Sequence, residues 1–161
     1  MMLRKHVEEE ARDLNGEAFT RFMDQLYDRI SALMMSIDVS DKLGALRAID
    51  ELIDVKLGES ASKVSRFSSN MRYPFEEKHD YEVLILGSKV LGHLARAGGA
   101  MTADEVEHQV KNAVEWLKGD RVEYRRFAAV LILKEMMMNS LQVWLQSGSS
   151  CLARVSLWLD Q

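Results

Sequence analysis

Three stretches of this chain each begin at an aspartate and run into an apolar helical pattern: Asp38-Val-Ser-Asp-Lys-Leu43, Asp80-Tyr-Glu-Val-Leu-Ile85 and Asp120-Arg-Val-Glu-Tyr-Arg125. Their first residues are separated by 42 and 40 positions. A period of this length is typical of stacked helical hairpins, in which each hairpin buries its apolar face against its neighbours. The pattern therefore predicts an elongated all-α protein.

The period favours one architecture in particular, a right-handed solenoid of helical hairpins of the HEAT or armadillo kind. We expect about three hairpins and an additional N-terminal helix, joined by short connections that make sequence neighbours antiparallel. Stacks of this kind present long surfaces to other proteins. The first functional expectation is therefore a protein-binding scaffold and not a catalyst.

The composition fits a folded helical protein. Of 161 residues, 47% are apolar and 29% are charged. The net charge of −4 gives no electrostatic case for nucleic-acid binding. The single cysteine, Cys151, cannot form an intrachain disulfide and favours a reducing compartment. Without a secretory signal or an apolar run that spans a bilayer, the expected location is cytoplasmic, with the nucleus as an alternative.

Apolar residues at intervals of three and four positions predict the individual helices. We expect helices over residues 3–14, 17–36, about 41–55, 61–72, 81–97, from about 102 onward, and 122–138. Asn15 and Gly16 tolerate a left-handed backbone and predict a helix stop. Ser40 or Asp41 is expected to cap the third helix, and Pro74 to mark either the end of the fourth or a kink in it.

Two further patterns predict how the C-terminal half packs. Thr102 and Glu105 have the spacing of a capping box, in which each side chain bonds to the other residue's amide. The run of seven apolar residues at 127–133 covers all sides of a helix and predicts that this helix is sandwiched between its neighbours. The helix between them is expected to bury Val106, Val110, Ala113, Val114 and Leu117.

Two Glu-x-x-His pairs raise an alternative function: Glu76 with His79, and Glu105 with His108. Such pairs ligate di-iron centres in helical bundles, and on this reading the chain is a small metal-dependent enzyme. Against it, the capping box places Glu105 in a first helical turn, and Pro74 interrupts the helix of the first pair. Solvated surface residues are the simpler interpretation.

The remaining reactive residues form no recognisable catalytic motif. His93, next to Leu94, is interpreted as a partly buried structural histidine. Cys151 has no histidine near it in sequence, and Gly98-Gly99 lacks the lysine of a phosphate-binding loop. The chain contains no kinase signature. We therefore expect no catalytic, cofactor-binding or metal-ligating residue.

A partner-binding surface is expected at the edge of the helix that follows Asp120. The candidates are the charged residues Arg121, Glu123 and Arg125. The alternative for the same residues is an ordinary solvated helix face.

Several long stretches together resemble the target of rapamycin (TOR) kinases in their plant form, over about residues 3–136. The resemblance is carried by residues 13–29 and 90–107, and by these segments: Leu43-Gly-Ala-Leu-Arg-Ala-Ile-Asp-Glu-Leu52 and Glu115-Trp-Leu-Lys-Gly-Asp-Arg-Val-Glu-Tyr-Arg-Arg-Phe-Ala-Ala-Val-Leu-Ile-Leu-Lys-Glu-Met136. It implies a piece of the N-terminal HEAT-repeat solenoid of a serine/threonine kinase in nutrient and growth signalling. It also implies a role in binding the partner Raptor and in assembling a TOR complex, without kinase activity in this piece.

The sequence departs from the family after Met136. We therefore expect a HEAT-repeat fragment over residues 1–138 and a divergent tail over 139–161, which is either an extra helix or disordered. An altered reading frame, a retained intron or a truncated gene would each explain the tail. A non-functional truncated product, with an open solenoid end that self-associates, is a third reading of the chain.

Overall fold

A computed structural model describes residues 2–55, 60–76 and 80–147, and the side chains among them except those of residues 60–62 and 140–147. No strand occurs within these ranges, and the predicted all-α class is confirmed. No helix within them has the length and apolar character needed to cross a membrane. The elements are α1 (Met2–Asp13), α2 (Gly16–Met34), α3 (Val39–Ile53), α4 (Ser60–Asn70), α5 (Tyr73–Glu76), α6 (Tyr81–Gly98), the 3-10 helix η1 (Gly99–Thr102), α7 (Ala103–Gly119) and α8 (Glu123–Ser147).

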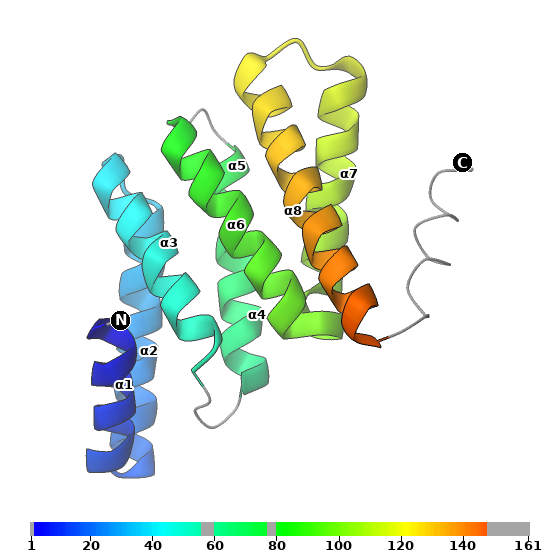
Figure 1. The fold of residues 1–161 in the computed structure, drawn as a ribbon. Helices are drawn as coiled ribbons and strands as arrows, with labels where there is room; N and C mark the ends of the chain where they lie inside the picture. The colour runs from blue at the N-terminus through cyan, green and yellow to red at the C-terminus, as the bar shows by residue number, and fades with distance from the viewer. Residues whose placement is uncertain (1, 56–59, 77–79, 148–161) are drawn as a thin grey trace.

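The helices form two layers of antiparallel hairpins (Figure 1). In one layer α3, α6 and α8 lie side by side, and α2, α4 and α7 lie behind them. The hairpins are α2 with α3, α4 with α6, and α7 with α8, while α1 packs against α3. The predicted stack of hairpins with an additional N-terminal helix is confirmed.

The recurring aspartates mark the starts of α3, α6 and α8, as their spacing predicts. Asp38 is the N-cap of α3 and accepts a hydrogen bond from the Ser40 amide at 2.8 Å. Asp120 accepts one from the Val122 amide at 2.8 Å just before α8. Asp80 precedes α6 without a side-chain capping bond. The prediction that Ser40 or Asp41 caps α3 is wrong, because the helix begins earlier, at Val39.

At two other helix ends, the predicted backbone conformation or the predicted capping hydrogen bonds are wrong. Asn15 is not left-handed: with φ −70° and ψ 163° it is the N-cap of α2, and its side chain accepts from the Ala18 amide. The Thr102–Glu105 capping box does not form. The Thr102 hydroxyl instead donates to the carbonyl of Gly99 at 3.1 Å. Gly99, at φ 51°, adopts the left-handed backbone that ends α6.

The core lies between the two layers. Its large, fully buried side chains include Leu46, Phe67, Leu84, Leu94 and Ile132. Burying a side chain of this size contributes about 2 kcal/mol. The packing around α6 is close: a Cβ built on Gly87 would lie 2.9 Å from the Cβ of Pro74.

A buried lysine closes the C-terminal end of α3. The Lys63 ammonium donates to the carbonyl oxygens of Leu52 at 2.9 Å, Ile53 at 3.0 Å and Val55 at 2.5 Å. These carbonyls belong to the end of a helix, where intrahelical partners are missing. Burial lowers the pKa of Lys63, and the nearby Asp54 carboxylate opposes that shift. The residue therefore serves as a structural cap.

α8 is buried on the sides that face its neighbours and open on another. Ala128, Ala129 and Ile132 are buried against the helices that pack on α8, mainly α6 and α7, whereas Val130 is 56% exposed. The predicted sandwiching of this helix between neighbours is confirmed, because α8 packs against both α6 and α7, although one side of it is open to solvent. α8 runs to Ser147 and so crosses the boundary expected at residue 138. The rest of the expected tail, 148–161, lies outside the described residues, as do residues 56–59 between the expected third and fourth helices.

Candidate protein-interaction site

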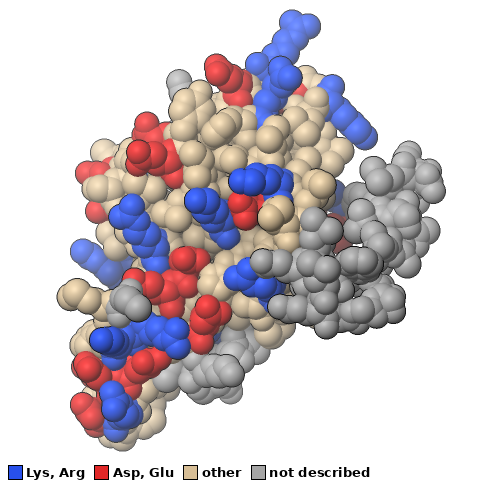
Figure 2. Space-filling model, in the orientation of Figure 1, with Lys and Arg blue, Asp and Glu red and all other residues tan. Residues whose placement is uncertain are grey.

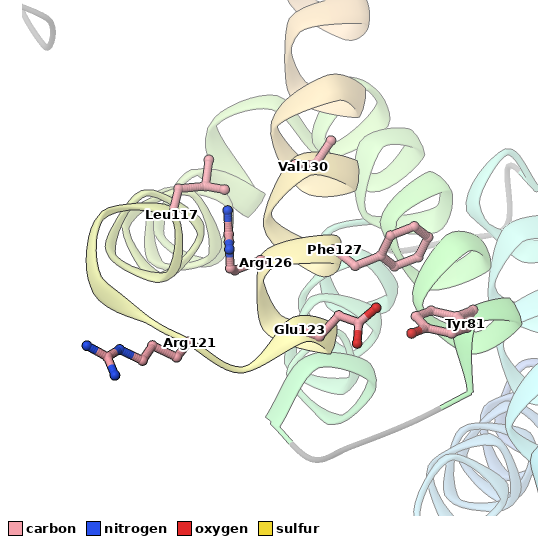
Figure 3. Close-up of a pocket in the computed structure, with 7 residues that line it drawn as sticks. All are labelled: Tyr81, Leu117, Arg121, Glu123, Arg126, Phe127 and Val130. Atoms are coloured by element: carbon pink, nitrogen blue, oxygen red, sulfur yellow. The ribbon is translucent and has the colours of Figure 1, made fainter.

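An open groove lies where the α7–α8 turn meets the start of α6. It has a volume of about 610 Å³. We call it the α8 groove, and its lining residues come from α6, α7, the turn and α8 (Figure 3): Tyr81, Leu117, Arg121, Glu123, Arg126, Phe127 and Val130. Because residues three and four positions apart share one face of a helix, α8 supplies four of them, at positions 123, 126, 127 and 130.

The floor of the groove is apolar and partly open to solvent. The rings of Tyr81 and Phe127 meet edge to face, with centroids 4.9 Å apart and an interplanar angle of 75°. Tyr81 is 50% exposed, Leu117 41% and Val130 56%. Figure 3 shows the two rings next to each other at one side of the groove, with Leu117 at the other. Clusters of exposed apolar side chains of this kind mark interaction sites.

Charged side chains rim this floor. Arg126 stands beside Leu117, Glu123 extends toward Tyr81, and Arg121 projects away from the rest (Figure 3). No ion pair or hydrogen bond joins Arg121, Glu123 or Arg126 through its side chain to any residue that the structure describes. Figure 2 shows Lys and Arg side chains projecting at the top of the molecule, where the α7–α8 turn lies.

Of the predicted partner-binding residues, the structure brings two together and separates the third. Arg121 and Glu123 line the groove. Arg125 does not: its Nη1 donates to Asp120 Oδ2 at 2.8 Å. This hydrogen bond raises the pKa of Arg125 and is the largest cause of the lowered pKa of Asp120. The groove uses Arg126 in its place.

Sequence reasoning missed Arg126 together with the apolar floor. One signal was present, because Glu123, Arg126, Phe127 and Val130 follow helical spacing on one face of α8. The pairing of Phe127 with Tyr81 had no sequence signal, since the two rings lie 46 positions apart and meet only through the packing of α6 on α8.

The Glu-x-x-His residues have other partners. Glu105 is 7% exposed and accepts from Arg72 Nε and from Gln109 Nε2, each at 2.8 Å. His108 is exposed, with its Nε2 3.1 Å from Asn112 Nδ2. His79 lies outside the described residues. Among those that are described, no group of three or more His, Cys, Asp or Glu side chains is arranged to hold a metal ion.

The most buried face of α7 matches the prediction at Ala113 but also includes Glu105 and Gln109, which were not predicted to be buried. Glu105, Gln109 and Ala113 point into the molecule, whereas Val106, Val110 and Val114 are only partly buried and Leu117 is exposed. The Glu105 carboxylate can be buried because it pairs with the Arg72 guanidinium, and the two residues lie 33 positions apart in sequence. A buried charge with a partner is tolerated where an unpaired one is not.

His93 joins α6 to α3. Its side chain is 15% exposed, with Nδ1 2.8 Å from Asp50 Oδ1 and Nε2 3.1 Å from Asp54 Oδ1. Carboxylates accept hydrogen bonds, so each contact needs a proton on the ring nitrogen that makes it. The predicted partly buried structural histidine is confirmed.

The chain has clear relatives among known proteins, although no protein-family model matches it. Serine/threonine-protein kinase TOR of Arabidopsis thaliana is 65% identical over 144 residues, and TOR of Oryza sativa is 67% identical over 142 residues. These matches cover 89% and 88% of this chain. The tor1 kinase of Schizosaccharomyces pombe is 37% identical over 138 residues, or 86% of the chain.

The matched segment is a small part of each relative. The chain spans 6% of the length of each of these three curated relatives. Identity to the two plant proteins is well above identity to the fungal one, in agreement with the plant-type resemblance of the sequence. As the counterpart of one short segment, the chain belongs to the TOR family of serine/threonine protein kinases.

Proposed function

We propose that this chain is a non-catalytic protein-binding scaffold, equivalent to part of a HEAT-repeat solenoid in a TOR-like kinase. Its partners would be a Raptor-like protein and other parts of a TOR complex, in the cytoplasm. The observation that carries the proposal is the combination of stacked helical hairpins with an open, partly apolar groove on a segment similar to TOR. Stacked hairpins bind partners through extended surfaces of this kind.

A scaffold fits the chemistry of the described residues better than an enzyme does. The names of the relatives state a kinase activity, but the segment shared with them is short. Phosphoryl transfer needs groups that hold a nucleotide and its metal ions, and the sequence contains no kinase motif for either. We infer that the activity in those names belongs to other parts of the relatives.

A competition experiment tests the proposal. The folded chain, immobilised through one terminus, is incubated with purified plant Raptor, and bound Raptor is then challenged with full-length plant TOR. We expect saturable binding that TOR displaces. A chain with normal helical circular dichroism that retains no Raptor would contradict the proposal, and heat-denatured chain is the control for non-specific capture.

A further inference from the structure

The α8 groove also indicates what kind of segment it binds, and this inference rests on the scaffold function proposed above. Its lining includes a Tyr and an Arg, two residue types enriched in interaction hot spots, beside a Phe and two aliphatic side chains. Each of Tyr81, Leu117 and Val130 is at least 41% exposed. An apolar anchor side chain from another protein would cover this floor, and the charged rim would then select the residues that flank the anchor.

The rim is asymmetric in charge. Arg121 and Arg126 lie on the side of the α7–α8 turn, and Lys118 is exposed in the last turn of α7. Glu123 extends toward the α6 side (Figure 3). Arg125, in the first helical turn of α8, already forms an ion pair with Asp120. One side of the groove thus carries cationic side chains that pair with no described residue, and the other side carries a carboxylate.

We propose that the α8 groove binds a short segment of a protein partner that carries an aromatic or leucine anchor followed by acidic side chains. The anchor lies on Tyr81 and Val130, beside Phe127. The acidic side chains, within one helical turn of the anchor, face Arg126, and Arg121 lies farther out on the same rim. Glu123 disfavours acidic groups at the other side and so fixes the direction of the segment, because complementary charge sets orientation and specificity.

Peptide selection tests this assignment. A display library of random 16-residue peptides is selected on the full chain and, in parallel, on Arg126→Glu and Val130→Ser chains. We expect the peptides selected on the unsubstituted chain to be enriched in Phe, Trp or Leu near Asp or Glu. In fluorescence anisotropy, selected peptides should bind Arg126→Glu about tenfold more weakly and Val130→Ser several-fold more weakly. Peptides with Lys in place of the acidic residues should instead prefer Arg126→Glu.

Two matched controls separate the groove from general surface effects. Arg47→Glu reverses an exposed charge on α3, and Ile37→Ser removes an apolar side chain that is 99% exposed between α2 and α3. Both should leave peptide binding unchanged. Circular dichroism checks that each variant is folded, which we expect because the substituted side chains are exposed.

Three outcomes would overturn the assignment. The first is a set of selected peptides without a preference for acidic residues, and the second is an equal loss of peptide affinity in the control variants. The third is a concentration-dependent dimer of the wild-type chain that Val130→Ser abolishes, because a second copy of the chain would then be the occupant of the groove. Failure here is distinguishable from failure of the scaffold function. If Arg126→Glu and Val130→Ser chains still bind Raptor while peptide selection fails, the scaffold remains and only the groove loses its role.

Discussion

The junction of α3 with α6 and the α8 groove use similar residue types in opposite ways. At the junction, the two nitrogens of His93 contact Asp50 of α3 and Asp54 just after it. Next to this junction, Lys63 of α4 donates to three carbonyls at the C-terminal end of α3. In the groove, Arg121 and Arg126 pair with no described residue, and Tyr81 and Val130 are half exposed. Groups that are paired within the chain stabilise the fold, whereas unpaired groups are available to another protein.

Matched leucine substitutions give the largest contrast between the two regions. Leu46 is fully buried in α3, and Leu117 is 41% exposed in the groove. We expect Leu46→Ala to reduce the free energy of unfolding by about 3 kcal/mol, because it leaves a cavity. Leu117→Ala should cost under about 1 kcal/mol. Urea denaturation measures both, and equal losses would remove the distinction between interior and groove.

Two glycines make a second matched pair. A Cβ on Gly87 would meet the rigid ring of Pro74, whereas one on Gly119, at the end of α7, meets nothing within 4 Å. Gly87→Ala should cost about 1–3 kcal/mol through overpacking. Gly119→Ala should stabilise the chain by about 0.4–1 kcal/mol, because it restricts the unfolded chain. Thermal unfolding of the two variants checks the opposite signs, and a stabilised Gly87→Ala would show that α6 and Pro74 are less tightly packed than described.

A double-mutant cycle measures the polar link of the junction. His93→Gln and Asp50→Asn should each lower stability, and their coupling should be about 0.5–1 kcal/mol, since Asp50 is partly solvated. Arg126→Gln in the groove should change stability by less than about 0.5 kcal/mol. Additive effects of His93→Gln and Asp50→Asn would show that the contact does not join α3 to α6.

The smallest expected effect concerns acid stability. Hydrogen bonds from the Ser40 side chain and amide lower the pKa of the Asp38 carboxylate. A lowered folded-state pKa contributes stability that is fully present above the usual value of 3.8 and is lost as the pH falls through the folded value. Asp38→Asn should therefore reduce stability near neutral pH and flatten its decline below pH of about 4. An unchanged acid profile in Asp38→Asn would show that this cap is not formed in solution.

Local patterns predicted the helices well and their tertiary partners poorly. The expected helix over 81–97 is α6 within one residue at its end, because apolar spacing and Gly98-Gly99 act locally. Thr102 and Glu105 fit a local capping rule, but the hydroxyl bonds to Gly99 and the carboxylate to Arg72. The bond to Gly99 is local, but the contact with Arg72, 33 positions earlier in the sequence, forms only through folding. The same limit applies to the groove, where Arg121 and Glu123 could be proposed from charge alone and Tyr81 could not.

Hydrogen–deuterium exchange with and without bound plant Raptor tests the central contrast most directly. Amides gain protection where a partner suppresses local opening. We expect added protection across the α7–α8 turn and the first turns of α8, with no change at the contact between α3 and α6. Added protection at the α3–α6 junction, with the α7–α8 turn unchanged in the complex, would contradict it.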